Sequence, residues 1–185
     1  MGKRILITDP AHDDITRYLG KHGDAISELA ENKGHSVNHM KLREVRREEV
    51  EKVMLKRNPD MIIFHGHGGT DRICGDGKEE ILIKKDVNDH LLKDKIVHSI
   101  TCSSASELGK SSVEKGCLAY IGFDDEFFCP YLPEFMAHPE KDFVAQCNLD
   151  PVMQLSTGLI KGNSVKEAYA RSQASFRKWL GLTAK

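Results

Sequence analysis

A histidine–glycine block and a cysteine block are the parts of this sequence best suited to covalent chemistry. His67 and Gly68 follow the apolar run at residues 61–64, and Cys102 stands near the end of an expected strand that begins at Ile96. An imidazole titrates near neutral pH and can deprotonate a thiol. A cysteine between a strand and a helix also faces backbone N–H groups that favour the thiolate. The two blocks predict nucleophilic catalysis, with Cys102 as the nucleophile and His67 as the base.

The same blocks contain groups that could complete a hydrolysis. Gly68 lets the backbone pass close to a substrate. The N–H groups of Gly68 and Cys102 can then face the oxyanion that develops on an attacked carbonyl group. His67 would give a proton to the leaving amine, and water would cleave the thioester.

Two other interpretations of these residues stay open. His65 and His67 are two positions apart, so on a continuing strand they share a face and could bind a metal together with Asp71. The tight HxHxDH run of binuclear metallohydrolases is missing, because position 69 is Gly69. Cys102 taken by itself is also compatible with buried packing.

Parallel strands are needed to bring the two blocks together. Short apolar runs alternate with helical patterns, which predicts an α/β fold with a mostly parallel central sheet and helices on both faces, a three-layer αβα sandwich. Ligands meet such sheets at the carboxyl ends of the strands. If the strands before His67 and Cys102 are neighbours, their tips lie about 4.8 Å apart. The expected strands cover residues 5–7, 36–42, 61–64, 96–102 and 118–121.

Local signals predict the connecting elements. Helical spacing covers residues 26–30 with Gly34 as a C-terminal cap, whereas Gly20 and Gly23 interrupt the same pattern earlier in the chain. Residues 127–158 contain four prolines, which predicts an irregular loop with short helices. The other expected elements are a helix near 50–54 ended by Pro59, a hairpin over 73–83 with its turn at Asp76 and Gly77, a short helix near 87–92, and capping boxes at Ser111 with Glu114 and at Ser164 with Glu167.

Length and composition limit the classes of function. The 185 residues predict a single domain over 1–185 with an irregular insertion around 124–158. The net charge of −1 argues against nucleic-acid and anionic-membrane partners. No run of apolar residues approaches the ~18 of a membrane span. The five cysteines form no CxxC pair, so we expect a reducing, cytoplasmic location without a structural zinc site. No cofactor is expected.

The order of these blocks resembles the caspase-like cysteine peptidases, most closely their CHAT domain. The similarity covers roughly residues 58–180. Its motifs are an apolar strand ending in the His–Gly block at 64–69, a strand ending in Cys102 and small polar residues, a Gly-led strand at 116–122, and a closing helix that starts at 162–164. The resemblance implies a caspase-like fold, His67 as general base and acid, and Cys102 as nucleophile, with His65 as the rival histidine. Gly68 and Cys102 would supply the oxyanion N–H groups.

The sequence departs from the family pattern where substrate preference is set. Metacaspases that cut after basic residues carry an aspartate two positions before the cysteine, and Ile100 stands there in this chain. Asp124 and Asp125 could replace it in binding Arg or Lys, although they also suit a solvated loop. The substrate is then a protein or peptide, with a possible regulatory protein partner or self-processing. A catalytically silent interaction module is the main alternative.

Overall fold

The structure, a computed structural model, describes residues 2–77 and 79–183. The chain forms two compact units, Met1–Phe127 and Phe128–Lys185. The first unit contains all the strands of the described residues, and the regular elements described in the second are helices. The expected α/β architecture is confirmed, whereas the expectation of one domain with an insertion around 124–158 stays a prediction.

A five-stranded parallel sheet forms the centre of the first unit. Its order is β2-β1-β3-β7-β8, and every neighbouring pair is parallel. The apolar residues of β1 and β3, at 5–7 and 61–64, are fully buried, as is typical of the centre of a parallel sheet covered on both faces. The outer strands β2 and β8 are largely only partly buried. The strands are β1 (Arg4–Asp9), β2 (Ser36–Lys41), β3 (Met61–His65), β7 (Ile96–Ile100) and β8 (Ala119–Ile121).

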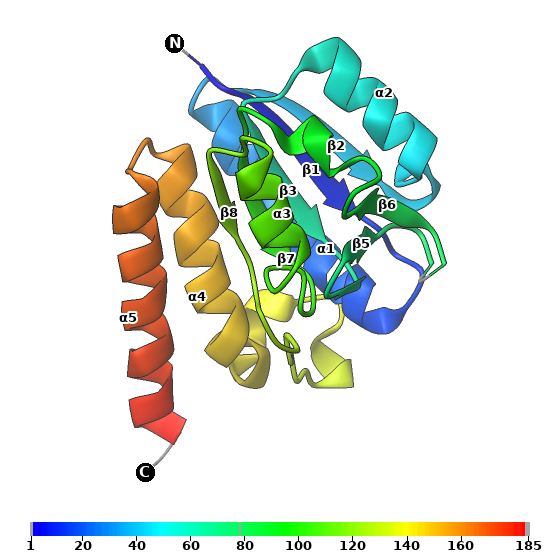
Figure 1. Ribbon diagram of the computed structural model, residues 1–185. Coiled ribbons are helices and arrows are strands. Elements are labelled where there is room, and N and C mark those ends of the chain that lie inside the picture. The colour runs from blue at the N-terminus through cyan, green and yellow to red at the C-terminus, as the bar shows by residue number, and fades with distance from the viewer. Residues whose placement is uncertain (1, 78, 184–185) are drawn as a thin grey trace. The chain divides into compact units, whose positions relative to one another are not determined.

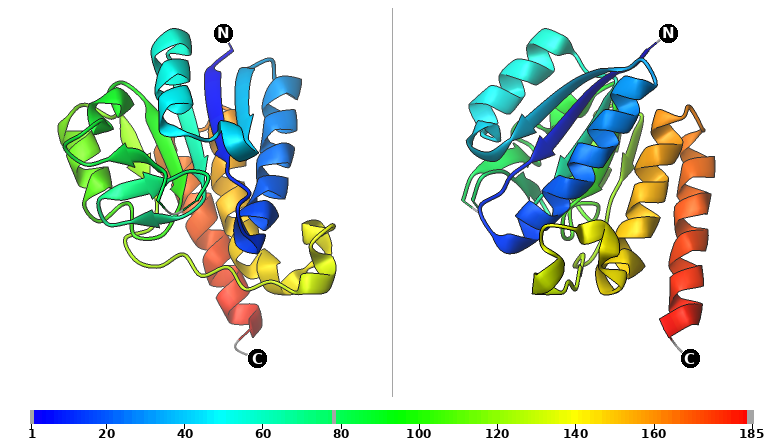
Figure 2. Two further views of the ribbon diagram at one scale, coloured as in Figure 1. Left: turned by 90° about the vertical axis from the view of Figure 1, so that its right-hand side faces the viewer. Right: turned by 180° about the vertical axis from the view of Figure 1, so that it is seen from behind.

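Helices cover both faces of this sheet, which gives the first unit three layers (Figures 1 and 2). Helix α1 (Asp14–Asn32) lies on one face, and α2 (Arg47–Arg57) and α3 (Leu108–Glu114) lie on the other. The core on the second face joins α2 to the strands through Val50 and Met54, which are fully or almost fully buried. The predicted helix near 50–54 is thereby confirmed.

The strand order creates a switch point beside β1. From β1 the chain crosses to β2 on one side, and it later returns to place β3 on the other side. The loops that leave the carboxyl ends of β1 and β3 therefore diverge, and ligands of doubly wound sheets bind in such a crevice. This edge holds the residues that follow β1, near Asp13, and those that follow β3, near His67.

Helix α1 runs through the two glycines that interrupt its pattern. Its N-cap Asp13 forms a capping box with Thr16. A Cβ atom at Gly23 would lie 2.0 Å from Oδ2 of Asp9, so glycine is required there to make room for a carboxylate. Gly34, with a φ of +77°, follows the end of the helix as expected.

A small antiparallel sheet follows β3. It contains β4 (Gly68–Gly69), β5 (Arg72–Cys74) and β6 (Ile81–Lys84) in that order. The predicted hairpin over 73–83 is therefore confirmed, with one more strand than expected. The short helices η1 (Leu42–Glu44) and η2 (Asp89–Leu92) are 3-10 turns, and η2 is the helix expected near 87–92.

The capping box predicted at Ser111 and Glu114 is wrong. Helix α3 begins earlier, after its N-cap Glu107, and Ser111 lies inside it. The Ser111 hydroxyl donates to Oδ2 of Asp89 at 2.7 Å. This serine therefore forms a hydrogen bond to a residue distant in sequence and does not cap a helix.

The second unit is a helical hairpin preceded by irregular chain. Helix α4 is longer than the short helices expected for residues 127–158, and it contains Pro151. Its N-cap Asp142 accepts hydrogen bonds from the backbone of Val144 and Ala145. The capping box of Ser164 and Glu167 is confirmed at the start of α5. The elements are η3 (Pro133–Phe135), η4 (Pro139–Lys141), α4 (Phe143–Ile160) and α5 (Val165–Thr183).

No helix within the described residues combines the length and the apolar character that a membrane span requires.

Candidate functional site

His67 lies two residues beyond β3 and is held by an aspartate from the loop after β1. Its Nε2 is 2.6 Å from Oδ2 of Asp13, and the ring is 22% exposed. Burial by itself raises the pKa of Asp13, but hydrogen bonds from His67 and Thr16 outweigh it and lower that pKa to about 2. The ionised carboxylate favours the tautomer in which Nε2 carries the proton. In a neutral ring, Nδ1 is then free to act as a base.

Asp13 performs two tasks with its two carboxylate oxygens. Oδ1 accepts hydrogen bonds from the Thr16 backbone at 2.9 Å and from the Thr16 hydroxyl at 2.8 Å, which caps α1. Oδ2 is thereby directed toward His67. Asp13 was not among the residues predicted for the site, although the Asp-x-x-Thr spacing of Asp13 and Thr16 is typical of a helix N-cap in the loop after the first strand.

The rival histidine, His65, is part of the buried interior. Its ring is 1% exposed, its Nδ1 is 2.6 Å from Oδ1 of Asp9, and its Nε2 is 2.9 Å from Nδ1 of His22. Both ring nitrogens therefore face protein groups rather than a substrate. Gly66, with a φ of +136°, breaks the strand alternation, so the expected shared face of His65 and His67 does not form.

Asp9 and His65 lie in a largely buried cluster with three further histidines, His22, His39 and His98. His39 also contacts Asp9 through Nε2. Burial by itself raises the pKa of Asp9, but the charge of His65 and the hydrogen bond with His39 outweigh it and lower that pKa to about 2. Burial lowers the pKa of His98 to about 3, and burial also lowers the pKa of His22 well below its usual value. His22 and His98 are therefore neutral in the folded protein at neutral pH.

Cys102 lies at the tip of β7, next to the tip of β3. The two strands pair in parallel with His65 opposite Ile100, so the predicted adjacency of these strands is confirmed. A Cβ atom at Gly68 would be 2.7 Å from the carbonyl oxygen of Cys102, which shows how closely the two loops approach. Cys102 is partly exposed, and its Sγ lies 3.9 Å from the carbonyl oxygen of Phe127.

The thiol and the imidazole are not hydrogen-bonded to each other. Within the described part of the chain, the His67 ring bonds to Asp13, and the recorded acceptor for the Cys102 thiol is the carbonyl group of Phe127. Catalytic hydrogen bonds are often long in unliganded sites and tighten when substrate binds. A Cys102–His67 dyad therefore requires the thiol and the ring to approach one another, and both side chains are partly exposed.

Three buried hydroxyl groups hold the turn that carries Cys102. The Ser99 and Thr101 hydroxyls are 2.9 Å apart, Thr101 donates to Ser104 at 2.9 Å, and Ser104 donates to Ser99 at 3.0 Å. Ser103 has a φ of +57°, so the chain turns sharply directly after the cysteine. This closed network of hydroxyls, two before Cys102 and one after it, holds the backbone on both sides of the cysteine.

The acidic pair Asp124 and Asp125 lies on a segment tied to this turn. The backbone N–H of Ser103 donates to the carbonyl oxygen of Asp125 at 2.8 Å, and that of Ala105 donates to Phe123 at 2.9 Å. Both aspartates are exposed. The structure thus brings the backbone of the predicted substrate-binding segment to the loop of Cys102.

The Gly68 N–H, one of the two predicted oxyanion donors, points away from β5. The backbone N–H of Cys74 donates to the carbonyl oxygen of His67 at 2.9 Å. Antiparallel ladders alternate between bonded and non-bonded pairs, so the next pair, Gly68 with Ile73, is non-bonded. The Gly68 N–H is therefore not used by this ladder.

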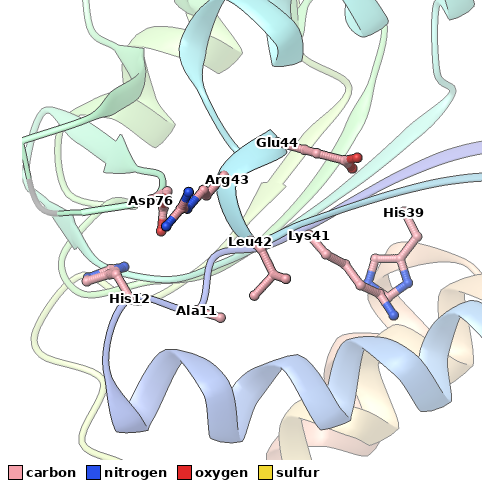
Figure 3. Close-up of a pocket in the computed structure, with 8 residues that line it drawn as sticks. All are labelled: Ala11, His12, His39, Lys41, Leu42, Arg43, Glu44 and Asp76. Carbon is pink, nitrogen blue, oxygen red and sulfur yellow. The ribbon is translucent and has the colours of Figure 1, made fainter.

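A pocket of about 680 Å³ opens beside the site, at the carboxyl ends of β1 and β2 (Figure 3). Charged side chains of both signs line it, among them Arg43 and Asp76. His12 lines this pocket, and its ring centroid is 5.2 Å from that of His67, so the pocket lies next to the candidate catalytic histidine. The lining residues are Ala11, His12, His39, Lys41, Leu42, Arg43, Glu44 and Asp76.

The side chains that could bind a metal together are not His65, His67 and Asp71, the set considered from the sequence. His65 is engaged by Asp9 and His22, and Asp71 pairs with Arg72 at 2.8 Å, so these two do not converge with His67. Among the described residues, the groups with closely spaced ligand atoms are His12 with Asp13 and His67, and Asp9 with Asp24 and His39.

Comparison with known proteins adds no assignment, because no protein-family model matches the chain and a search of curated proteins finds no significant match.

Proposed function

We propose that this protein is a cysteine peptidase of the caspase-like type, in which Cys102 is the nucleophile and His67 the general base and acid. The observation that carries the proposal is the 2.6 Å hydrogen bond between His67 Nε2 and Asp13 Oδ2, at the edge where β3 and β7 end side by side. It supports the proposal because an oriented imidazole with a free Nδ1, beside a partly exposed thiol, is the arrangement that activates a nucleophile. Asp13 is a positioning residue.

The proposed reaction moves one proton at each stage. His67 Nδ1 takes the proton of the Cys102 thiol, and the sulfur attacks the peptide carbonyl carbon. The N–H groups of Gly68 and Cys102 stabilise the oxyanion, and the protonated His67 gives its proton to the leaving amine. Water, deprotonated by His67, then hydrolyses the thioester and regenerates the thiol.

The exposed carboxylates of Asp124 and Asp125 favour a substrate with Arg or Lys before the cleaved bond. Their segment is bonded to the turn that carries Cys102, so a basic side chain could reach them from the nucleophile. We propose protein or peptide substrates in the cytoplasm, with cleavage gated by a protein partner or by self-processing.

The test is peptide cleavage together with thiol labelling. A positional peptide library with varied residues at the cleavage site is digested by the wild-type protein, Cys102→Ser and Cys147→Ser. Cys147 is also partly exposed but lies in α4, so its variant is the matched control for loss of one accessible thiol. We expect cleavage and stoichiometric labelling by a peptidyl chloromethylketone in the wild type and in Cys147→Ser, and neither in Cys102→Ser.

Two results would remove the proposal. One is peptide cleavage that persists unchanged in Cys102→Ser. The other is wild-type protein that cleaves no library member and labels at Cys102 no faster than free cysteine, which would favour the catalytically silent interaction module.

A further inference from the structure

We propose that His12, Asp13 and His67 bind a divalent transition-metal ion, with zinc as the best fit, and that the bound ion switches off the thiol chemistry of Cys102. The metal site stands on its own geometry. Its inhibitory effect rests on the function proposed above.

The three ligand atoms already lie close to the spacing that zinc requires. They fall within 4.8 Å of one another, and Nε2 of His12 is 3.5 Å from Oδ2 of Asp13. Tetrahedral zinc with bonds of ~2.0–2.1 Å separates its ligand atoms by roughly 3.4 Å. The His12–Asp13 pair thus needs almost no movement. The His67–Asp13 pair, now at the hydrogen-bond distance of 2.6 Å, has to open by under one ångström.

His12 has no other task in the described structure. Both of its ring nitrogens are buried, and neither has a hydrogen-bond partner. Buried polar atoms are normally satisfied, so these two nitrogens are suited to bind a ligand that enters from outside the chain. The ring nevertheless borders the open pocket of Figure 3, so an ion has a route to it.

The ligands are held by elements that oppose rearrangement. Asp13 is fixed by its capping bonds to Thr16, including the 2.8 Å bond from the Thr16 hydroxyl to Oδ1. Such outer hydrogen bonds orient a metal-binding carboxylate. Two imidazoles and one carboxylate are a donor set that zinc commonly takes, and the fourth position remains open. The second cluster, Asp9 with Asp24 and His39, is less suited because the Lys41 ammonium group already pairs with Asp24.

Metal binding removes the base that the proposed reaction needs. Without metal, the Nε2 proton of His67 is donated to Asp13, and Nδ1 keeps its lone pair. An ion on Nε2 displaces that proton, and the neutral ring then carries its proton on Nδ1. No lone pair is left to accept the proton of the Cys102 thiol. The Asp13 carboxylate therefore orients the base His67 in the metal-free protein and binds the ion in the metal-bound protein.

Calorimetric titration of the metal-free, full-length protein with zinc chloride tests the site directly. His12→Gln removes one ligand and replaces a neutral histidine by another uncharged side chain. His90→Gln is the matched control, because it removes an exposed histidine on η2. We expect one zinc per chain in the wild type and in His90→Gln, and at least tenfold weaker binding in His12→Gln. The visible spectrum of cobalt bound to wild-type protein gives a second readout of tetrahedral coordination. Absence of stoichiometric binding, or equal affinities in both variants, would overturn the site.

Alkylation by iodoacetamide, followed at Cys102 by mass spectrometry, tests the inhibition. We expect saturating zinc to slow this alkylation at least tenfold in the wild type and to have little effect in His12→Gln. An unchanged rate with zinc bound would refute the inhibitory effect. Zinc binding that depends on His12 in a protein that cleaves no peptide would support the metal site and remove only the peptidase, so the two failures can be told apart.

Discussion

Exchanging Asp13 for asparagine separates its role as a helix cap from its role as partner of His67. Asparagine caps a helix about as well as aspartate. Its amide, however, supplies no negative charge to His67 and can present an N–H group to the imidazole. A charge-assisted hydrogen bond contributes about 1.5–3 kcal/mol. Because the Asp13 side chain is 36% exposed, we take the lower limit. A loss of about 1.4 kcal/mol is a tenfold effect, so we expect kcat/KM for peptide cleavage to fall about tenfold.

Asp14→Asn is the matched control for this change. Asp14 lies in the first turn of the same helix, is 61% exposed, and pairs with Arg17 rather than with a histidine. Both changes remove one negative charge from the same helix N-terminus, which costs about 0.3–1 kcal/mol of stability in each case. Urea unfolding should therefore show this loss in both variants, and up to about 1.5 kcal/mol more in Asp13→Asn, which also loses its charged hydrogen bond with His67. Only Asp13→Asn should slow both peptide cleavage and the alkylation of Cys102.

Equal kcat/KM and equal alkylation rates in the two variants would contradict the role of the aspartate–histidine pair. A loss of activity in Asp13→Asn that is fully accounted for by the fraction of unfolded protein would contradict it as well.

Further predictions concern stability. Gly23→Ala places a methyl group 2.0 Å from Asp9 Oδ2 and should cost about 1–3 kcal/mol by overpacking, whereas Gly20→Ala, whose nearest neighbour would be 3.9 Å away, should be neutral or stabilising in urea unfolding. Asp9 has its pKa lowered to about 2, so it stabilises the fold above pH ~4 and loses that contribution, about 2 kcal/mol, as the pH falls toward 2; Asp9→Asn should lack this part of the acid sensitivity. His98 has its pKa lowered to about 3, so the unfolded chain binds its proton first as the pH falls below ~6.5. Between pH 7.5 and 5.5, His98→Gln should therefore lose about 1 kcal/mol less than the wild type, and an equal loss would contradict the buried, neutral state of this ring.

The sequence by itself determined the elements and the positions of the two reactive side chains along them. The apolar runs at residues 5–7 and 61–64 predict buried parallel strands because this pattern depends on residues close in sequence. The capping box at Ser164 was readable for the same reason, since its two partners are three residues apart. The positions of a histidine and a cysteine at the ends of two strands could therefore be predicted from the sequence.

The tertiary structure alone decided which of these side chains meet which partners. Asp13 and His67 are 54 residues apart, and they pair only because the sheet order places β1 beside β3. The positive φ at Gly66 separates His65, which is turned into the interior, from His67 at the edge, although simple alternation had placed both on one face. Ser111, which matched a local cap, instead binds a carboxylate 22 residues away. Periodicity and caps are local, whereas burial, charge pairing and the state of an imidazole depend on neighbours that only the folded chain supplies.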